Sequence, residues 1–272
     1  MILKEGGNVF KTEPDKQMMT QRIATQDVHP TIQFIEKITG LTFDEEDWLG
    51  TTGKKNDPDG AFEKNSSGDL DLNTDLNKIS KEELIKKLSD WLVSQGVPQD
   101  QIMNKGRTKQ DGWIAAAGDQ VHFRTPIQGG QGFVQTDFMF TSNPDFQRGA
   151  KRGGTEAYGG KYRAMLLASL ARGRGFKFSP KFGVVDPEAG DTVVANSWDQ
   201  IAEVLLGPGA KEEDTHTVES MIDFIKNDPN YEELVAQFRD TLEKDGMKLP
   251  ESAELVRIRE LAGMSLNSTV ML

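Results

Sequence analysis

The chain of 272 residues contains no cysteine. This absence excludes disulfide bonds, thiolate metal sites and cysteine nucleophiles, and it is compatible with a reducing cytoplasm. Long apolar runs are also missing, and the first residues lack the apolar centre of a secretion signal. We therefore expect a cytoplasmic protein that has no membrane partner.

Histidine is scarce, and none of the three histidines has the spacing of a metal-ligand pair. Walker-type phosphate loops, a Rossmann fingerprint and nucleophilic triads are absent too. The formal net charge of −11 argues against generic binding to duplex DNA. That charge is uneven, because the segment 148–181 holds nine Lys or Arg and a single acid, Glu156. A basic segment of this kind suits an enzyme that handles phosphates.

Two carboxylates stand one residue apart in the stretch 69–72, Asp-Leu-Asp-Leu. In a strand, Asp69 and Asp71 would point to one face, while Leu70 and Leu72 would point to the other face and into a core. Neighbouring anions repel each other, and a divalent cation between them removes that repulsion. The spacing therefore predicts a metal site.

A third carboxylate, Asp137, lies in the middle of the stretch 132–140, which is rich in aromatic and β-branched residues and predicts a strand. A charge there costs several kcal/mol unless it is paired or bound to a metal. Three carboxylates on two neighbouring strands form an all-oxygen site, which suits Mg²⁺, or Mn²⁺ in its place.

The order of these motifs resembles that of the polymerase-β-like nucleotidyltransferase superfamily. The signature of that family is an apolar residue followed by Gly-Ser or Gly-Gly, a spacer, an Asp-x-Asp between apolar residues, and a later single Asp on another strand. Here the stretch 49–53, Leu-Gly-Thr-Thr-Gly, comes first, and it is followed by Asp69, Asp71 and Asp137.

Two features depart from the family pattern. Thr51 stands in place of the usual Ser or Gly, although it keeps a hydroxyl, and the spacer is longer, with 56–65 as an inserted loop. The resemblance covers residues 30–140 of the chain. The compact core, polar N-terminus and lack of cysteine also resemble phage-encoded nucleotidyltransferase-like proteins, which would act in the host cytoplasm.

The resemblance implies a nucleotide-binding transferase that moves a nucleoside monophosphate from a nucleoside triphosphate such as ATP to an acceptor hydroxyl. Its cofactor would be Mg²⁺ or Mn²⁺, held by the catalytic carboxylates Asp69, Asp71 and Asp137. Its phosphates would be bound by the turn residues Gly50, Thr51 and Thr52. The end of an RNA, a protein side chain and a small alcohol all fit as acceptors.

Further cations for the triphosphate are expected from the helix predicted over 161–172. The family commonly brings a basic residue from the helix that follows its core. Lys161 and Arg163 lie at the start of this helix, nearer in sequence to the predicted site than its other cations. They are our candidates for nucleotide binding.

We expect an α+β fold: a small mixed β-sheet, the nucleotidyltransferase core, flanked by helices and followed by a mainly helical domain. The boundaries that we expect are an N-terminal arm over 1–29, the catalytic core over 30–145, and a C-terminal domain over 146–272 that begins with the basic segment. Stretches of helical periodicity in that last domain are 197–206, 218–226, 231–244 and 253–262.

Local signals place individual elements within the core. Pro30 is expected to open a helix that ends at Gly40, and Ser80 begins a capping box at the start of another helix. The alternating stretch 120–125 predicts a strand that forms a hairpin with 132–140, with His122 and Arg124 on the face opposite Val121 and Phe123. The stretch 141–160 reads as a loop.

Two other readings of the acidic residues stay open. The chain could be a non-catalytic assembly protein that binds nucleotides or a partner through a relict site. It could also be a calcium-binding module, because an EF-hand loop that starts at Asp71 would place Glu82 at its twelfth position. That loop would have Leu76 at its sixth position, where the turn requires glycine.

Overall fold

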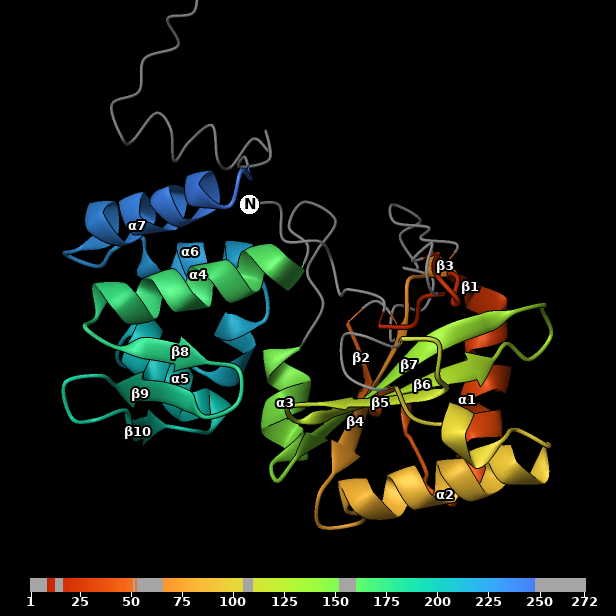
Figure 1. Cartoon of the computed structure of the whole chain (residues 1–272). Helices are drawn as coiled ribbons and strands as arrows, with labels where there is room; N and C mark the ends of the chain where they lie inside the picture. Colours follow the sequence, from red (N-terminus) through yellow and green to blue (C-terminus); the bar gives the residue numbers. More distant parts are fainter. Residues whose placement is uncertain are drawn as a thin grey trace, which may run out of the picture. The chain divides into compact units, whose positions relative to one another are not determined.

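The computed structural model describes residues 9–12, 17–50, 52, 66–104, 110–151 and 160–247 (Figure 1). The chain divides into two compact units, residues 4–153 and residues 154–272 together with 1–3. Helices and strands are mixed in both units, so the fold class is α+β as predicted. No described helix has the length and apolar character needed to span a lipid bilayer.

A five-stranded mixed sheet forms the centre of the first unit. Its strand order is β2-β4-β7-β6-β5. The central pair β4 and β7 is parallel, and the other neighbours are antiparallel. The predicted hairpin is confirmed as β6 and β7. The bounds of the strands are β2 Trp48–Leu49, β4 Leu70–Asp75, β5 Ile114–Ala117, β6 Gln120–Pro126 and β7 Phe133–Thr141.

Alternation along these strands gives the sheet two different faces. Leu70, Leu72, Val121 and Phe138 are fully buried in one core cluster, together with apolar residues of two helices, α1 Thr25–Thr39 and α2 Lys81–Ser94. On the opposite face, the intervening positions Asp71, His122 and Asp137 carry polar side chains. This division confirms the predicted orientation of the two leucines beside the acidic pair.

The helix α2 begins as predicted, with a capping box formed by Ser80 and Glu83. In contrast, α1 begins at Thr25, so Pro30 lies inside the helix rather than at its start. Pro30 is the sixth residue of the helix, beyond its first turn, so the hydrogen bond that an N–H here would donate to the Gln26 carbonyl is missing. The helix ends at Gly40, whose φ of +71° is the left-handed conformation that favours glycine.

The segment predicted as an N-terminal arm is built into the first unit where it is described. Phe10 and Ile23 are fully buried. Strand β1 Ile23–Ala24 pairs with β3 Ser66–Ser67 in a two-stranded sheet. The described residues 9–12 and 17–29 therefore belong to the fold of this unit.

A short helix, α3 Pro144–Ala150, lies within the stretch that we expected to be a loop. Its N-terminus is capped by Asn143, whose side chain accepts a hydrogen bond from the Phe146 N–H, and Pro144 occupies the first turn. The boundary between the units follows at 153/154 instead of 145/146. Arg148 and Lys151 of the basic segment consequently belong to the first unit.

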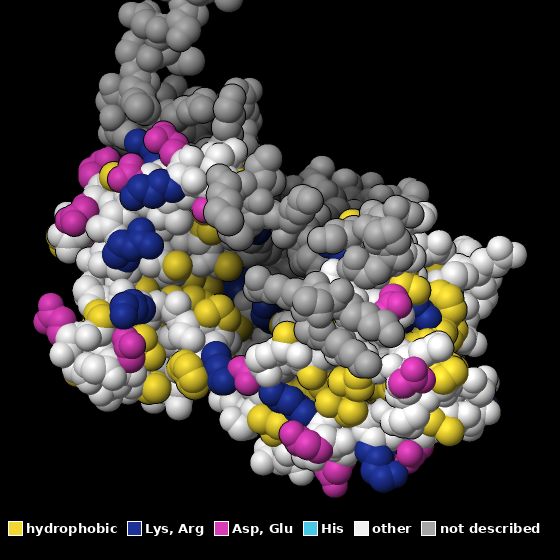
Figure 2. Space-filling view, in the orientation of Figure 1, with side chains coloured by type: hydrophobic (Ala, Val, Ile, Leu, Met, Phe, Trp, Pro, Cys, Tyr) yellow, Lys and Arg dark blue, Asp and Glu magenta, His cyan; other side chains and the backbone are white. Residues whose placement is uncertain are grey.

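The second unit combines helices with a small antiparallel sheet of order β10-β9-β8. Its helices are α4 Gly160–Gly173, α5 Trp198–Leu206, α6 Val218–Ile225 and α7 Tyr231–Lys244. Its strands are β8 Lys177–Ser179, β9 Gly183–Asp186 and β10 Thr192–Ala195. On the described surface shown in Figure 2, the Lys and Arg side chains over α4 and α7 stand apart from one another among acidic, apolar and uncharged groups. The helix predicted over 253–262 lies outside the described residues.

Three short 3₁₀ helices complete the described elements. They are η1 Glu45–Asp47, η2 Gln99–Gln101 and η3 Glu212–Thr215. The first of them, η1, leads directly into β2.

Candidate metal centre

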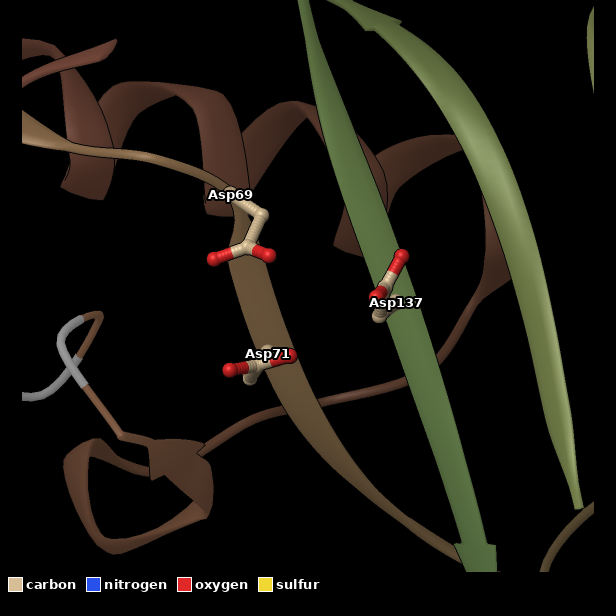
Figure 3. A group of neighbouring side chains, drawn as sticks. All are labelled: Asp69, Asp71 and Asp137. Atoms are coloured by element: carbon tan, nitrogen blue, oxygen red, sulfur yellow. The ribbon is translucent and has the colours of Figure 1, made fainter. Parts of the chain in front are cut away.

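The three carboxylates predicted from the sequence meet on the polar face of the central sheet. Asp71 lies on β4 directly beside Asp137 on the parallel strand β7, and Asp69 immediately precedes β4. Each residue offers one carboxylate oxygen, and these three oxygens lie within 4.8 Å of one another. Figure 3 shows the side chains gathered on one side of the two strands. Carboxylates at this spacing can share a divalent cation.

The hydrophobic core holds this arrangement from the opposite face. Leu70 and Leu72 are fully buried on either side of Asp71, and Phe138 is fully buried next to Asp137. A slip of one residue in β4 would turn both leucines toward the polar face, so the core opposes such a slip. The apolar side chains therefore define the register that brings the carboxylates together.

The clustering of acids strongly affects Asp71. Burial, followed by the charges of Asp69 and Asp137, raises the pKa of Asp71 from 3.8 to about 8, and the charge of Lys151 opposes the rise. A cation between the carboxylates would remove the repulsion that contributes to this shift. The electrostatics of the cluster thus suit a bound metal ion.

Asp137 is held by polar neighbours on both sides. Its Oδ1 lies 2.7 Å from Nδ1 of His122, the residue opposite it on β6. The Nε2 of Gln135 donates to the same oxygen at 2.9 Å and to Oδ2 at 3.2 Å. The sequence placed His122 and Arg124 correctly on one face of β6, but it did not single out Gln135.

Gly50 lies at the turn after β2, with a φ of +57°. A Cβ atom at this position would lie 3.1 Å from Oδ2 of Asp71. Glycine therefore lets the backbone pass close to the carboxylate without strain or crowding. The Gly50 N–H points to the carbonyl of Lys151 at 3.4 Å, so this N–H already has an acceptor.

Thr52 is buried and contacts the backbone of β4. Its Oγ1 accepts a hydrogen bond of 2.8 Å from the Asp71 N–H and lies 3.5 Å from the carbonyl of Asp69. Its own N–H donates to the Leu49 carbonyl. These contacts give Thr52 a different role from the predicted one, because its hydroxyl holds the turn against β4 rather than standing ready for a phosphate. Thr51 lies outside the described residues.

Lys151 is a cation near the carboxylate cluster. It belongs to the basic segment 148–181, but it was not selected from the sequence as a candidate site residue. It directly follows α3 and is exposed, and its charge acts on Asp71. The helix α3 is tied to the same part of the unit, since Arg148 donates to the buried Asp47 at 3.0 and 3.1 Å. The position of Lys151 near the carboxylates follows from the helix α3 and from the boundary between the units, neither of which the sequence predicted.

A cavity of about 290 Å³ lies farther along β4. Asn73, two residues beyond Asp71 and on the same face, lines this cavity together with residues from α3 and from the segment around η1. Its side-chain N–H groups donate to Asp47 and to the Pro144 carbonyl, both at 3.1 Å. The cavity also has charged side chains in its wall: Asp47, Asp75, Lys78, Asp145 and Arg148.

The two cations proposed for nucleotide binding lie in the second unit, on α4. Lys161 is exposed and forms an ion pair with Asp245 at 3.3 Å. Arg163 is 1% exposed, its Nε donates to the Thr215 carbonyl at 2.6 Å, and its guanidinium lies 5.0 Å from the ring centroid of Trp198. The structure therefore corrects the prediction for Arg163, because its head group is enclosed in the interior of its own unit.

This position predicts a structural effect for Arg163. Replacing it with alanine removes a buried side chain and the donor to the Thr215 carbonyl, and we expect a loss of about 2–4 kcal/mol in the free energy of unfolding. The exposed Lys161→Ala variant is the matched control, with an expected change of less than about 1 kcal/mol. Urea unfolding followed by circular dichroism measures both. An increased KM for nucleotide in Arg163→Ala at unchanged stability would contradict this assignment.

An EF-hand loop that starts at Asp71 is excluded by the secondary structure. Residues 71–75 form the strand β4, and residues 71, 73 and 75 of a strand are spread along its length instead of curling around one ion. Within the described parts of the chain, the cluster of Asp69, Asp71 and Asp137 is the one group of three or more such side chains arranged to hold a metal.

Comparisons of the chain with protein-family models, with curated proteins and with solved structures give no match.

Proposed function

We propose that the protein is a metal-dependent nucleotidyltransferase that transfers a nucleoside monophosphate from a nucleoside triphosphate to an acceptor hydroxyl. The observation that carries this proposal is the convergence of three carboxylates, from β4 and its parallel neighbour β7, within 4.8 Å. The order of the Gly-Thr-Thr turn, the Asp-x-Asp pair and the later Asp resembles the polymerase-β-like superfamily and supports the same reading.

The residues present fit Mg²⁺ or Mn²⁺. All three side chains offer oxygen, which these ions prefer. Burial and the charges of Asp69 and Asp137 raise the pKa of Asp71, and a bound cation would oppose both effects by favouring the ionised carboxylate. Bound there, the ion would polarise the transferred phosphoryl group and stabilise the departing pyrophosphate.

In this reaction the acceptor oxygen forms a bond to the α-phosphorus, the bond from that phosphorus to the bridging oxygen breaks, and pyrophosphate leaves. The proton of the acceptor hydroxyl passes to a carboxylate of the triad. Gly50 lets the turn approach Asp71, and Lys151 supplies positive charge near the phosphates.

The test is the release of pyrophosphate from each of the four NTPs with Mg²⁺, in the presence of an RNA mixture or of glycerol as the acceptor. We expect release by the unaltered chain and at least about a 100-fold slower rate in Asp69→Asn and Asp137→Asn, because each change removes negative charge from the metal site. Isosteric asparagine keeps the volume of each side chain.

Asp75→Asn is the matched control. Asp75 lies on the same strand and face as Asp71 but outside the triad, and its Oδ1 accepts a hydrogen bond from the Asn77 N–H that asparagine can also accept. This variant should release pyrophosphate at the unaltered rate. Equal rates in Asp137→Asn and the unaltered chain would overturn the proposal. Nucleotide binding without any pyrophosphate release would instead support the non-catalytic alternative with a relict site.

A further inference from the structure

Asp137 differs from the other two carboxylates because side chains on its own sheet hold it in place. His122 reaches it from the neighbouring strand β6, and Gln135 reaches it from two residues earlier on β7. Both partners are buried. We infer that His122 and Gln135 are positioning residues that aim the Asp137 carboxylate at the metal, an inference that rests on the metal site proposed above.

The direction of the Gln135 amide follows from its second partner. The backbone N–H of Val9 lies 2.9 Å from Oε1 of Gln135, and a backbone N–H can only donate. The oxygen of the amide must therefore face Val9, which turns the NH₂ group toward Asp137. The hydrogen bond from the Val9 N–H thus fixes the orientation of the Gln135 amide, which donates to Asp137.

His122 acts from the other side of the same carboxylate. A carboxylate that binds a metal is ionised and only accepts hydrogen bonds, so Nδ1 of His122 carries the hydrogen of the 2.7 Å contact. His122 and Gln135 both contact Oδ1, and Oδ2 receives only the longer contact of 3.2 Å. Oδ2 is consequently the oxygen with the most capacity left for a metal ion.

The N-terminal segment, residues 9–12 and 17–22, completes this network. Asn104 donates to the Val9 carbonyl at 3.0 Å, and Asn104 Oδ1 accepts from the Gly112 N–H at 2.8 Å. The Gln21 N–H donates to the Phe133 carbonyl at the start of β7. The segment that we had expected to be an arm thus holds a side chain that orients a metal ligand.

Groups that orient a metal ligand change the affinity of the site for the metal, whereas a purely structural residue changes only the stability of the fold. The experiment is a titration of the full chain with Mn²⁺ alone, with free Mn²⁺ measured by electron paramagnetic resonance and the melting temperature measured in parallel. We expect Gln135→Met and His122→Leu to raise the Kd for Mn²⁺ by about 10–100-fold. His122→Asn should restore most of the affinity, because its Nδ2 can donate from the position of Nδ1.

Thr136→Val is the matched control on β7. Thr136 lies between Gln135 and Asp137 but points to the core face, where its hydroxyl contacts that of Thr125 at 2.7 Å. We expect this variant to lower the melting temperature and to leave the Kd for Mn²⁺ unchanged. If Gln135→Met and His122→Leu behave in the same way, the inference is wrong.

Asp71→Asn separates failure of the inference from failure of the proposed function. If the unaltered chain binds Mn²⁺ and Asp71→Asn does not, the metal site stands, and the variants of His122 and Gln135 decide the inference alone. If the unaltered chain binds no Mn²⁺, both the metal site and the positioning role are overturned.

Discussion

Replacing Asp71 with asparagine should abolish nucleotidyl transfer and, at the same time, stabilise the metal-free protein. Transfer should fall by about 100- to 1,000-fold, because a central carboxylate of the metal site is lost. Stability should rise because burial, together with the charges of Asp69 and Asp137, raises the pKa of Asp71 to about 8, which means that the folded chain disfavours this charge. Removing it relieves a cost of several kcal/mol above that pH.

The pH dependence of stability gives this prediction a clear sign. In the unfolded chain Asp71 loses its proton near its ordinary pKa of 3.8, whereas in the folded, metal-free chain it keeps the proton up to about pH 8. The stabilisation that this proton provides is fully present below pH 3.8, the pKa in the unfolded chain. It is lost as the pH rises through about 8, the pKa in the folded chain. Between these two values the unaltered chain should therefore lose stability relative to Asp71→Asn.

Urea unfolding in the presence of a chelator, at pH 5 and at pH 8.5, measures this difference. The free energy of unfolding of the unaltered chain should fall relative to that of Asp71→Asn between these two conditions, and Asp75→Asn should follow the unaltered chain. Adding Mg²⁺ at pH 8.5 should raise the melting temperature of the unaltered chain and leave that of Asp71→Asn unchanged. If the free energies of unfolding of the unaltered chain and of Asp71→Asn changed in parallel with pH, the folded chain would not disfavour the charge of Asp71.

The second large effect is expected from Leu72→Ala. Leu72 is fully buried in the core cluster, and it is paired with Trp48 on β2 and with Phe138 on β7. The change removes apolar contacts on both sides of β4 and leaves a cavity, so we expect a loss of about 2–5 kcal/mol in the free energy of unfolding. Urea unfolding measures this loss as a lower midpoint.

Leu76→Ala is the control for this prediction. Leu76 directly follows β4, and 44% of it is exposed. The control should change stability by less than about 0.5 kcal/mol. A loss in Leu72→Ala no larger than that of the control would mean that β4 is not fixed by its core face, and the account of its register would then be wrong.

Much of the central sheet could be predicted from local patterns. Strand side chains alternate strictly, so the sequence was enough to separate Leu70 and Leu72 from the carboxylate face, and His122 from Val121. The motif order also brought the distant Asp137 into the same hypothesis as the acidic pair. Their convergence within 4.8 Å depends on the parallel pairing of β4 and β7, which only the structure shows.

Other features depend on contacts between distant segments, which local patterns do not record. The sequence predicts that Arg163 binds the triphosphate. It does not predict the burial of this side chain, because arginine is seldom fully buried without partners, and its partner Thr215 lies 52 residues away. In the sequence, Gln135 is an ordinary polar residue of a strand. Its role depends on the hydrogen bond from the Val9 N–H, which only the structure shows. The helix α3 was missed because it spans only 7 residues and includes a glycine.

The link between Val9 and Gln135 joins positions 126 residues apart. During synthesis the N-terminal segment leaves the ribosome first, and its acceptor on β7 follows only when nearly all of the first unit has been made. An intermediate that contains β4 alone would have Asp69 and Asp71 without the third carboxylate. The site is therefore expected to mature late in folding, and a ribosome-bound chain that stops before β7 should show no selective Mn²⁺ binding.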